Sequence, residues 1–314
     1  MPIAWTYRGV SGLSADDFHF LADRYDDTYG WSEDMAESWI GRVVRGQMYL
    51  LLGHRGWLTR LWRAPSGRAW ASEGGMRPGV HVETSGELLT PQWSFTPLPG
   101  VLSGVYGLDE SNVFAFGQRV QSPGIHGIVH RWDGSRWAET PPPPGLFLGM
   151  HGLRPDLVYA VGDGGIVARW DGLQWVRVPA PTRAVLSSVQ VVSEDEIHAC
   201  GAGYRVLEGS VHGWAERIIA DGPLLSLGVF QGKVLVTTGS RGIHAVEGNR
   251  LVEWAKDVPA TQLDARGDLL AACPDELVAT RDGETFTRIP IGVFREATSA
   301  FVPAWKAGRQ RRQR

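Results

Sequence analysis

The chain has 314 residues, of which 43% are hydrophobic and 21% are charged, and its formal net charge is -3 at pH 7. A balance this close to neutral gives no general affinity for nucleic acid, and the length allows a sizeable buried core. No apolar run reaches the roughly 18 residues that a membrane span needs. The first residues also lack the basic and apolar regions of a secretion signal. We therefore expect a soluble, cytoplasmic protein that binds neither membranes nor nucleic acid.

The first 100 residues carry a weak form of a pattern that is clearer further along. Gly9 to Ala22 reads GVSGLSADDFHFLA and matches residues 104–117 without a gap. Residues 47–61 are similar to residues 157–170, and residues 5–8 resemble an outer strand. This region therefore predicts one enlarged repeat unit or two, and its first strand is predicted to complete the last unit of a ring.

An acidic and aromatic segment interrupts the pattern between residues 23 and 46. Ser32 is a typical helix N-cap, two acids follow it, and Met35, Trp39 and Val43 share one helical face. We predict a loop and a short helix over residues 33–46 that bind a protein with a basic surface. A helix that only plugs one end of the ring explains the composition equally well. The predicted contact residues are Tyr25, Asp26, Asp27, Tyr29, Trp31, Glu33 and Asp34.

The repeat is clear from residue 101 onward. Gly104 to Gly117 reads GVYGLDESNVFAFG, and 45 residues later Gly149 to Gly162 reads GMHGLRPDLVYAVG. The copies continue into RWDGSRW at residues 131–137 and RWDGLQW at residues 169–175. In each unit, four short runs rich in Val, Ile, Leu, Tyr and Trp are separated by turn sequences. This pattern predicts a four-stranded antiparallel sheet.

Five such units are clear, and they predict an all-β β-propeller. Units with an apolar face that they cannot bury alone must close on one another, and radial closure gives this fold. Seven blades are predicted, with six as the alternative, in one domain over residues 1–305. The basic tail at residues 306–314 is expected to be disordered. The clear units span residues 101–145, 146–184, 185–223, 224–260 and 261–292, with one or two divergent blades in residues 1–100.

The unit resembles the WDG repeats of propellers from myxobacteria and similar bacteria. Those repeats are in turn similar to the YCF48-like and BNR (Asp-box) propellers. The resemblance covers residues 101–292 well and residues 5–100 weakly. Residues 280–286, TRDGETF, are close to an Asp box, which is a structural turn in those families. The resemblance thus implies a propeller fold and a binding function, and it implies no enzymatic activity.

One strand position is predicted to face the central channel of the propeller. In successive copies it holds Ser11, Tyr106, His151 and Gln190. A variable polar and aromatic set on a constant scaffold suits the binding of a ligand or partner, and a solvated channel explains it equally well.

The sequence contains no catalytic or metal-binding motif. Its nine histidines form no HxH or HExxH pattern, and Cys200 and Cys273 lack the spacing of metal ligands. We expect no metal and no cofactor. Arg288-Ile289-Pro290 also occurs in sialidases, but there it precedes the Asp boxes, whereas here it follows the last one.

These observations favour a non-enzymatic propeller that binds another protein as a scaffold, regulator or immunity-type inhibitor, without an obligate homo-oligomer. A carbohydrate-binding or sialidase-like propeller is one alternative. An assembly factor like the YCF48-like family is a second one.

Overall fold

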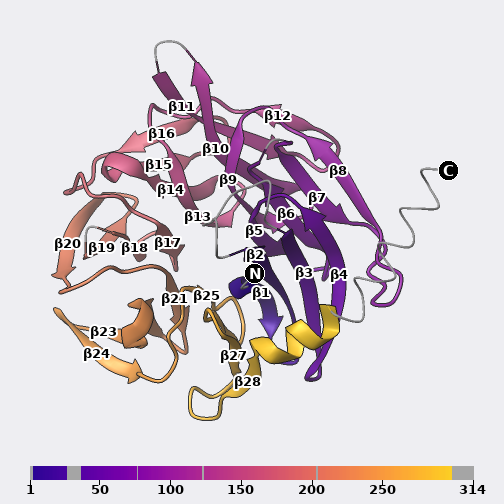
Figure 1. Cartoon of the computed structure of the whole chain (residues 1–314). Helices are drawn as coiled ribbons and strands as arrows, with labels where there is room; N and C mark the ends of the chain where they lie inside the picture. The colour runs from indigo at the N-terminus through magenta and orange to yellow at the C-terminus, as the bar shows by residue number, and fades with distance from the viewer. Residues whose placement is uncertain (1–2, 27–36, 76, 122–123, 203, 299–314) are drawn as a thin grey trace.

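The computed structural model is a ring of seven four-stranded antiparallel sheets, or blades, around a central axis (Figure 1). It describes residues 3–26, 37–75, 77–121, 124–202 and 204–298. In every blade the four strands are neighbours in chain order, and the first of them lines the axis. The predicted all-β propeller of four-stranded blades is confirmed, with seven blades.

Blades 1 and 2 come from the N-terminal third of the chain. Blade 1 consists of β1 (Ile3–Ser14), β2 (Asp17–Asp26), β3 (Glu37–Val44) and β4 (Gln47–Arg55). Blade 2 consists of β5 (Leu58–Arg63), β6 (Ala69–Glu73), β7 (Gly79–Glu83) and β8 (Trp93–Pro97).

The next three blades contain the clearest repeats. Blade 3 consists of β9 (Val101–Asp109), β10 (Asn112–Gln121), β11 (Gly124–Trp132) and β12 (Trp137–Glu139). Blade 4 consists of β13 (Phe147–Arg154), β14 (Leu157–Gly162), β15 (Val167–Trp170) and β16 (Trp175–Val178). Blade 5 consists of β17 (Ser188–Val191), β18 (Ile197–Cys200), β19 (Arg205–Ser210) and β20 (Gly213–Ile219).

Two blades with short strands complete the ring. Blade 6 consists of β21 (Leu227–Phe230), β22 (Lys233–Thr237), β23 (Ile243–Glu247) and β24 (Arg250–Ala255). Blade 7 consists of β25 (Gln262–Asp264), β26 (Leu269–Ala272), β27 (Glu276–Thr280) and β28 (Thr287–Pro290). A short helix over residues 291–298 follows β28, and no described helix has the length and apolarity to cross a membrane.

The Trp-Asp-Gly sequences form the turns between the two outer strands of a blade. In blade 4 the Asp171 carboxylate accepts the backbone N–H groups of Leu173 and Gln174 at 2.9 and 2.8 Å. Gly172 has a φ of +98°, a conformation that glycine adopts at little cost. The tryptophans that flank this turn pack together, with ring centroids 5.6 Å apart, and both contact Phe114 of blade 3. The repeated motif therefore shapes each turn and also joins neighbouring blades.

The predicted helix over residues 33–46 is wrong where the structure describes it. Residues 37–44 form β3, which pairs with β2 on one side and β4 on the other. Trp39 and Val43 are both buried. Positions four residues apart share a face in a strand as well as in a helix, so their spacing could not separate the two structures. Residues 33–36 lie outside the described part of the chain.

Two further expectations about the N-terminal region are also wrong. Residues 47–61 do not repeat the hairpin at residues 157–170, because they span the outer strand of blade 1 and the start of blade 2. The N-terminal strand does not complete the last blade, since β1 is the innermost strand of blade 1.

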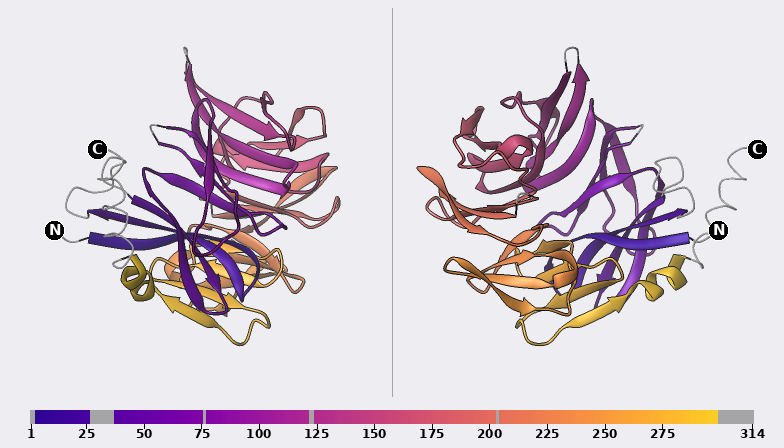
Figure 2. Two further views of the ribbon diagram at one scale, coloured as in Figure 1. Left: turned by 90° about the vertical axis from the view of Figure 1, so that its right-hand side faces the viewer. Right: turned by 60° about the vertical axis from the view of Figure 1, so that its left-hand side comes forward.

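A C-terminal helix closes the seam between blades 7 and 1 instead. Figure 2 shows this helix and the N-terminal part of β1 projecting from the same side of the ring. Phe294 of the helix is fully buried in a cluster with residues of blades 7 and 1. Its ring centroid lies 5.2 Å from that of Trp5, 5.8 Å from those of Tyr7 and Phe20, and 6.4 Å from that of Trp39.

Candidate functional site

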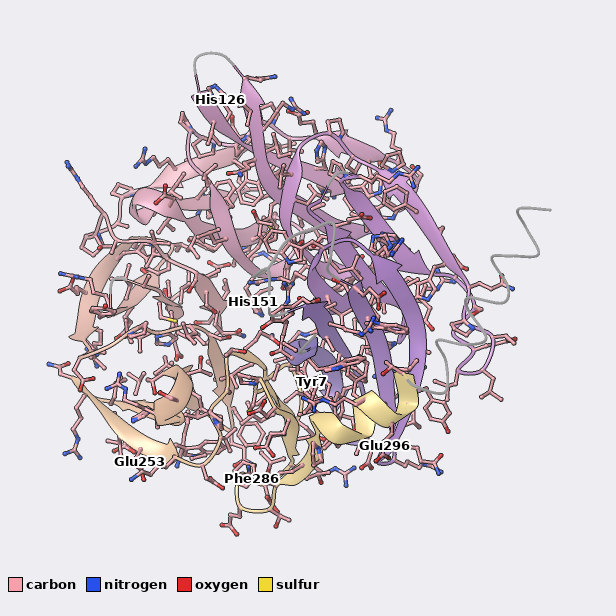
Figure 3. All side chains as sticks on the ribbon, viewed as in Figure 1. Tyr7, His126, His151, Glu253, Phe286 and Glu296 are labelled. Carbon is pink, nitrogen blue, oxygen red and sulfur yellow. The ribbon has the colours of Figure 1, made fainter. Side chains whose placement is uncertain are left out.

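A central cavity of about 590 Å³ lies on the axis of the ring. Figure 3 shows Tyr7 and His151 near this axis, whereas His126 and Glu253 lie at the rim. The innermost strand of each blade contributes to the wall. In blade order, residues of these strands that line the cavity are Ser11, Arg60, Tyr106, His151, Gln190, Leu227 and Asp264. All four residues that the sequence placed at the channel line this cavity.

A half-buried ion pair joins blades 7, 1 and 2 at the cavity wall. Arg266 donates to Asp264 through Nη2 at 2.6 Å and through Nε at 3.0 Å. It also donates to Ser11 Oγ at 2.8 Å and to the carbonyl oxygen of Arg63 at 2.9 Å. Burial alone would raise the pKa of Asp264, but the charge and hydrogen bonds of Arg266 outweigh it and lower that pKa. Both members of the pair are therefore ionised and mutually neutralised.

Aromatic side chains of blades 3 and 4 form another part of the wall. The Tyr106 hydroxyl donates to the carbonyl oxygen of Gly152 at 3.0 Å and accepts the N–H of the same residue at 2.9 Å. The rings of Tyr106 and His151 lie 5.3 Å apart. His151 Nδ1 accepts the Val191 N–H at 3.1 Å, and its Nε2 faces the Gln190 amide at 3.1 Å. Burial, assisted by the charge of Arg266, lowers the pKa of His151 to about 4, so this imidazole is neutral at pH 7.

Two further arginines line the cavity, and their environments differ. Arg8 binds the buried carboxylate of Asp23 at 2.9 Å and the carbonyl oxygen of Leu58 at 2.6 Å. The Arg60 guanidinium has no carboxylate partner among the described residues, and burial lowers its pKa. Arg60 is half-buried and lines the cavity. It therefore contributes an unneutralised positive charge to the wall.

Sequence reasoning missed Arg60, Asp264 and Arg266. Asp264 occupies the same strand position in blade 7 as the four predicted residues do in their blades, because it pairs with the second strand in the same way. An extension of the repeat alignment to blade 7 would have found it. Arg60 belongs to the divergent blade 2, where a register shift interrupts the inner hairpin between Leu58 and Arg60.

The acidic and aromatic segment is only partly described. Tyr25 lies in β2, opposite Ala4 of β1, and Asp26 is the last residue of β2. The other predicted contact residues, which are Asp27, Tyr29, Trp31, Glu33 and Asp34, lie outside the described part of the chain. The basic tail at residues 306–314 also lies outside it.

The sialidase-like features occupy structural positions. Arg288 lies in β28, the outer strand of blade 7, where it binds Glu276 at 2.6 Å and also pairs with Asp257. In the Asp-box sequence, the Asp282 carboxylate accepts the backbone N–H groups of Glu284 and Thr285 at 2.9 and 2.7 Å. Arg288 therefore forms ion pairs and Asp282 forms turn hydrogen bonds, both in the outer part of blade 7.

Comparisons with known proteins find likeness at the level of the fold. No protein family model and no curated protein matches the chain. The solved structure "YCF48 bound to D1 peptide" is similar with a TM-score of 0.60 and 13% identity, over 92% of this chain and 93% of that one. The WD40 β-propeller domain of Doa1 is similar with a TM-score of 0.62 and 8% identity, over 92% and 93% of the two chains.

The computationally designed protein Ika8 is also similar, with a TM-score of 0.57 and 12% identity over 91% of this chain and 96% of that one. At these identities the likeness concerns the fold alone. The chain is a seven-bladed β-propeller that is structurally similar to YCF48 and WD40 propellers at low sequence identity.

Proposed function

We propose that this protein is a non-enzymatic propeller that binds another protein, and that a carboxylate-bearing segment of the partner enters the central cavity. The observation that carries this proposal is the Arg60 guanidinium, which faces the cavity without a carboxylate partner among the described residues. A half-buried guanidinium has lost part of its hydration, and an arginine and a carboxylate can form two parallel hydrogen bonds. An incoming carboxylate would supply that missing partner.

The rest of the cavity suits a short stretch of polypeptide. Its volume of about 590 Å³ falls within the usual range for pockets that hold small molecules, so it has room for a few residues and not for a folded domain. Tyr106 and Trp62 offer aromatic surface, and Gln190 offers a side-chain amide for hydrogen bonds to a peptide backbone. The charges of Arg8 and Arg266 are already neutralised by Asp23 and Asp264, which leaves Arg60 as the charged anchor.

The comparison with YCF48 supports this use of the fold, because that propeller was solved with a bound peptide. Scaffold, regulator, immunity-type inhibitor and assembly factor are the alternative biological roles, and each of them requires protein binding. The acidic and aromatic segment at residues 23–46 is proposed as a second contact, to be tested by replacing Tyr25, Tyr29 and Trp31 together with alanine.

A peptide array with matched free and amidated C-termini tests the cavity. We expect the wild-type protein to retain peptides with a free carboxylate and to lose them when that group is amidated. Arg60→Gln should lose the same peptides, whereas Arg136→Gln, whose guanidinium is 79% exposed on blade 3, should keep them. Because Arg60 forms no ion pair with another described residue, Arg60→Gln breaks no such contact and should melt at about the same temperature as the wild type. Identical retention by the Arg60→Gln variant and the wild-type protein would refute the proposal.

A further inference from the structure

Three potential metal ligands meet at the interface between blades 1 and 2. His54 comes from β4 of blade 1, whereas Glu73 and His81 come from β6 and β7 of blade 2. His54 Nε2 lies 2.9 Å from Glu73 Oε1, and His81 Nε2 lies 2.8 Å from Glu73 Oε2. One ligand atom from each residue falls within 4.8 Å of the other two. Two imidazole nitrogens and a carboxylate therefore converge from three strands on one point.

The cluster is enclosed but can be reached from solvent. The side chains of Glu73, His81 and His54 are 4%, 10% and 20% exposed to solvent, respectively. The rings of the two histidines lie 4.9 Å apart at 62°, and Phe95 packs on His81 at 4.6 Å. A buried carboxylate with an imidazole on each side and an opening on the His54 side has the form of a three-ligand pocket.

Gly56, in the connection between the two blades, leaves space beside the ligand atoms because it has no side chain. A Cβ atom at this position would lie 2.8 Å from His54 Nε2 and 3.1 Å from Glu73 Oε1. The buried His54 Nε2 is close to the carboxylate and yet forms no hydrogen bond of acceptable geometry. This nitrogen is therefore a polar atom that points into the cluster without a satisfied partner, which is unfavourable unless something else binds it.

We propose that His54, Glu73 and His81 bind a divalent transition-metal ion of the Zn²⁺ class, with solvent as the fourth ligand. Two histidines and one glutamate form a donor set that zinc adopts in proteins, at about 2.0 to 2.2 Å from each ligand atom. Around such an ion, neighbouring ligand atoms would be separated by roughly 3.3 Å. The contacts at 2.8 and 2.9 Å are made by different oxygens of Glu73. Because one ligand atom from each residue lies within 4.8 Å of the other two, small side-chain adjustments would bring the three atoms to this separation.

The ion would add a further link between two blades that are already joined by packing, by the short connection at residues 56–57 and by polar contacts such as those of Arg63 with Asp17 and of Trp93 with the Leu51 carbonyl oxygen. Since His54 belongs to the outermost strand of blade 1, the bond would tie the rim of that blade to the middle of blade 2. The expected effect is a higher melting temperature in the presence of the metal, because an ion that binds only the folded chain stabilises it.

Titration of the tag-free, chelator-treated protein with Zn²⁺ tests this site. We expect one ion per chain, an increase in melting temperature with Zn²⁺, and visible absorption bands of a four-coordinate site when Co²⁺ is used. His54→Gln, Glu73→Gln and His81→Gln should each weaken Zn²⁺ binding at least tenfold. His126→Gln, which alters an exposed histidine at the rim (Figure 3), should leave it unchanged.

Glu73→Gln keeps the size of the side chain, so its folding can be checked by circular dichroism before the titration is interpreted. If a variant fails to fold, the Co²⁺ spectrum of the wild-type protein still reports whether a four-coordinate site forms. Absence of stoichiometric binding by the wild type would overturn the proposal. Equal Zn²⁺ affinity in folded wild-type and Glu73→Gln proteins would overturn it as well.

Discussion

The contact of Phe294 with blade 1 gives the sharpest test of how the ring is held closed. Phe294→Ala removes a fully buried ring that meets four other aromatic rings at centroid distances of 5.2 to 6.4 Å. Truncation of a buried phenylalanine costs about 3 to 5 kcal/mol, and this range includes the aromatic contacts. At about 2.1 cal/mol/K of unfolding entropy per residue, a loss of about 4 kcal/mol lowers the melting temperature of a chain of 314 residues by about 6 °C.

Val293→Ala is the matched control, because Val293 lies next to Phe294 in the same helix and is 42% exposed. Thermal unfolding followed by circular dichroism and by tryptophan fluorescence should show the large shift for Phe294→Ala alone. Trp5 and Trp39 contact Phe294, so the fluorescence should report the same transition. If both variants melted within 1 °C of each other, the helix would not be the element that secures the seam.

Two other features of the cavity lead to further predictions. Tyr106→Phe leaves the buried N–H and carbonyl groups of Gly152 without their partner and should cost about 2 kcal/mol of unfolding free energy. Tyr49→Phe alters an exposed hydroxyl that donates to Gln47 and should cost almost nothing, so equal denaturant midpoints for the two variants would contradict this reasoning. The pKa of His151 is lowered from 6.5 to about 4, so the unfolded chain takes up a proton first and stability is lost as the pH falls below 6.5. Between pH 7.5 and pH 5 the wild type should lose about 2 kcal/mol more than His151→Gln in urea unfolding, whereas parallel losses would show that His151 does not resist protonation.

The parts of the fold that follow from local chemistry could be predicted from the sequence. The Asp171-Gly172 turn is determined by residues within four positions, namely a carboxylate that accepts two backbone N–H groups and a glycine at positive φ. The same turn recurs at Asp133 and Asp282, so the strands around it and their antiparallel order could be derived. The step from five clear units to seven blades needed only the length of chain left over.

Features that depend on contacts between distant residues could not be predicted in this way. The spacing of Trp39 and Val43 fits either a helix or a strand, and pairing with β2 and β4 decided the outcome. Closure by Phe294 depends on a helix that meets β1 nearly three hundred residues away. The periodicity of the repeat found His151, but Arg60 could not be placed because its blade departs from the repeat.

Each blade is built from one uninterrupted stretch of chain, and this has an evolutionary consequence. The boundaries of the structural unit coincide with those of a segment of the gene, so the duplication or loss of one segment would leave every remaining sheet with four strands. In a ring whose first strand completes its last sheet, the N-terminal strand and the other three strands of that sheet lie at opposite ends of the gene. Duplication or loss of one segment would then leave an incomplete sheet unless that strand was kept. Here the event would leave the sheets intact, and only the packing between blades that become new neighbours would have to form again. Selection on a change in the number of blades would therefore act at the interfaces between blades, including the seam that Phe294 covers.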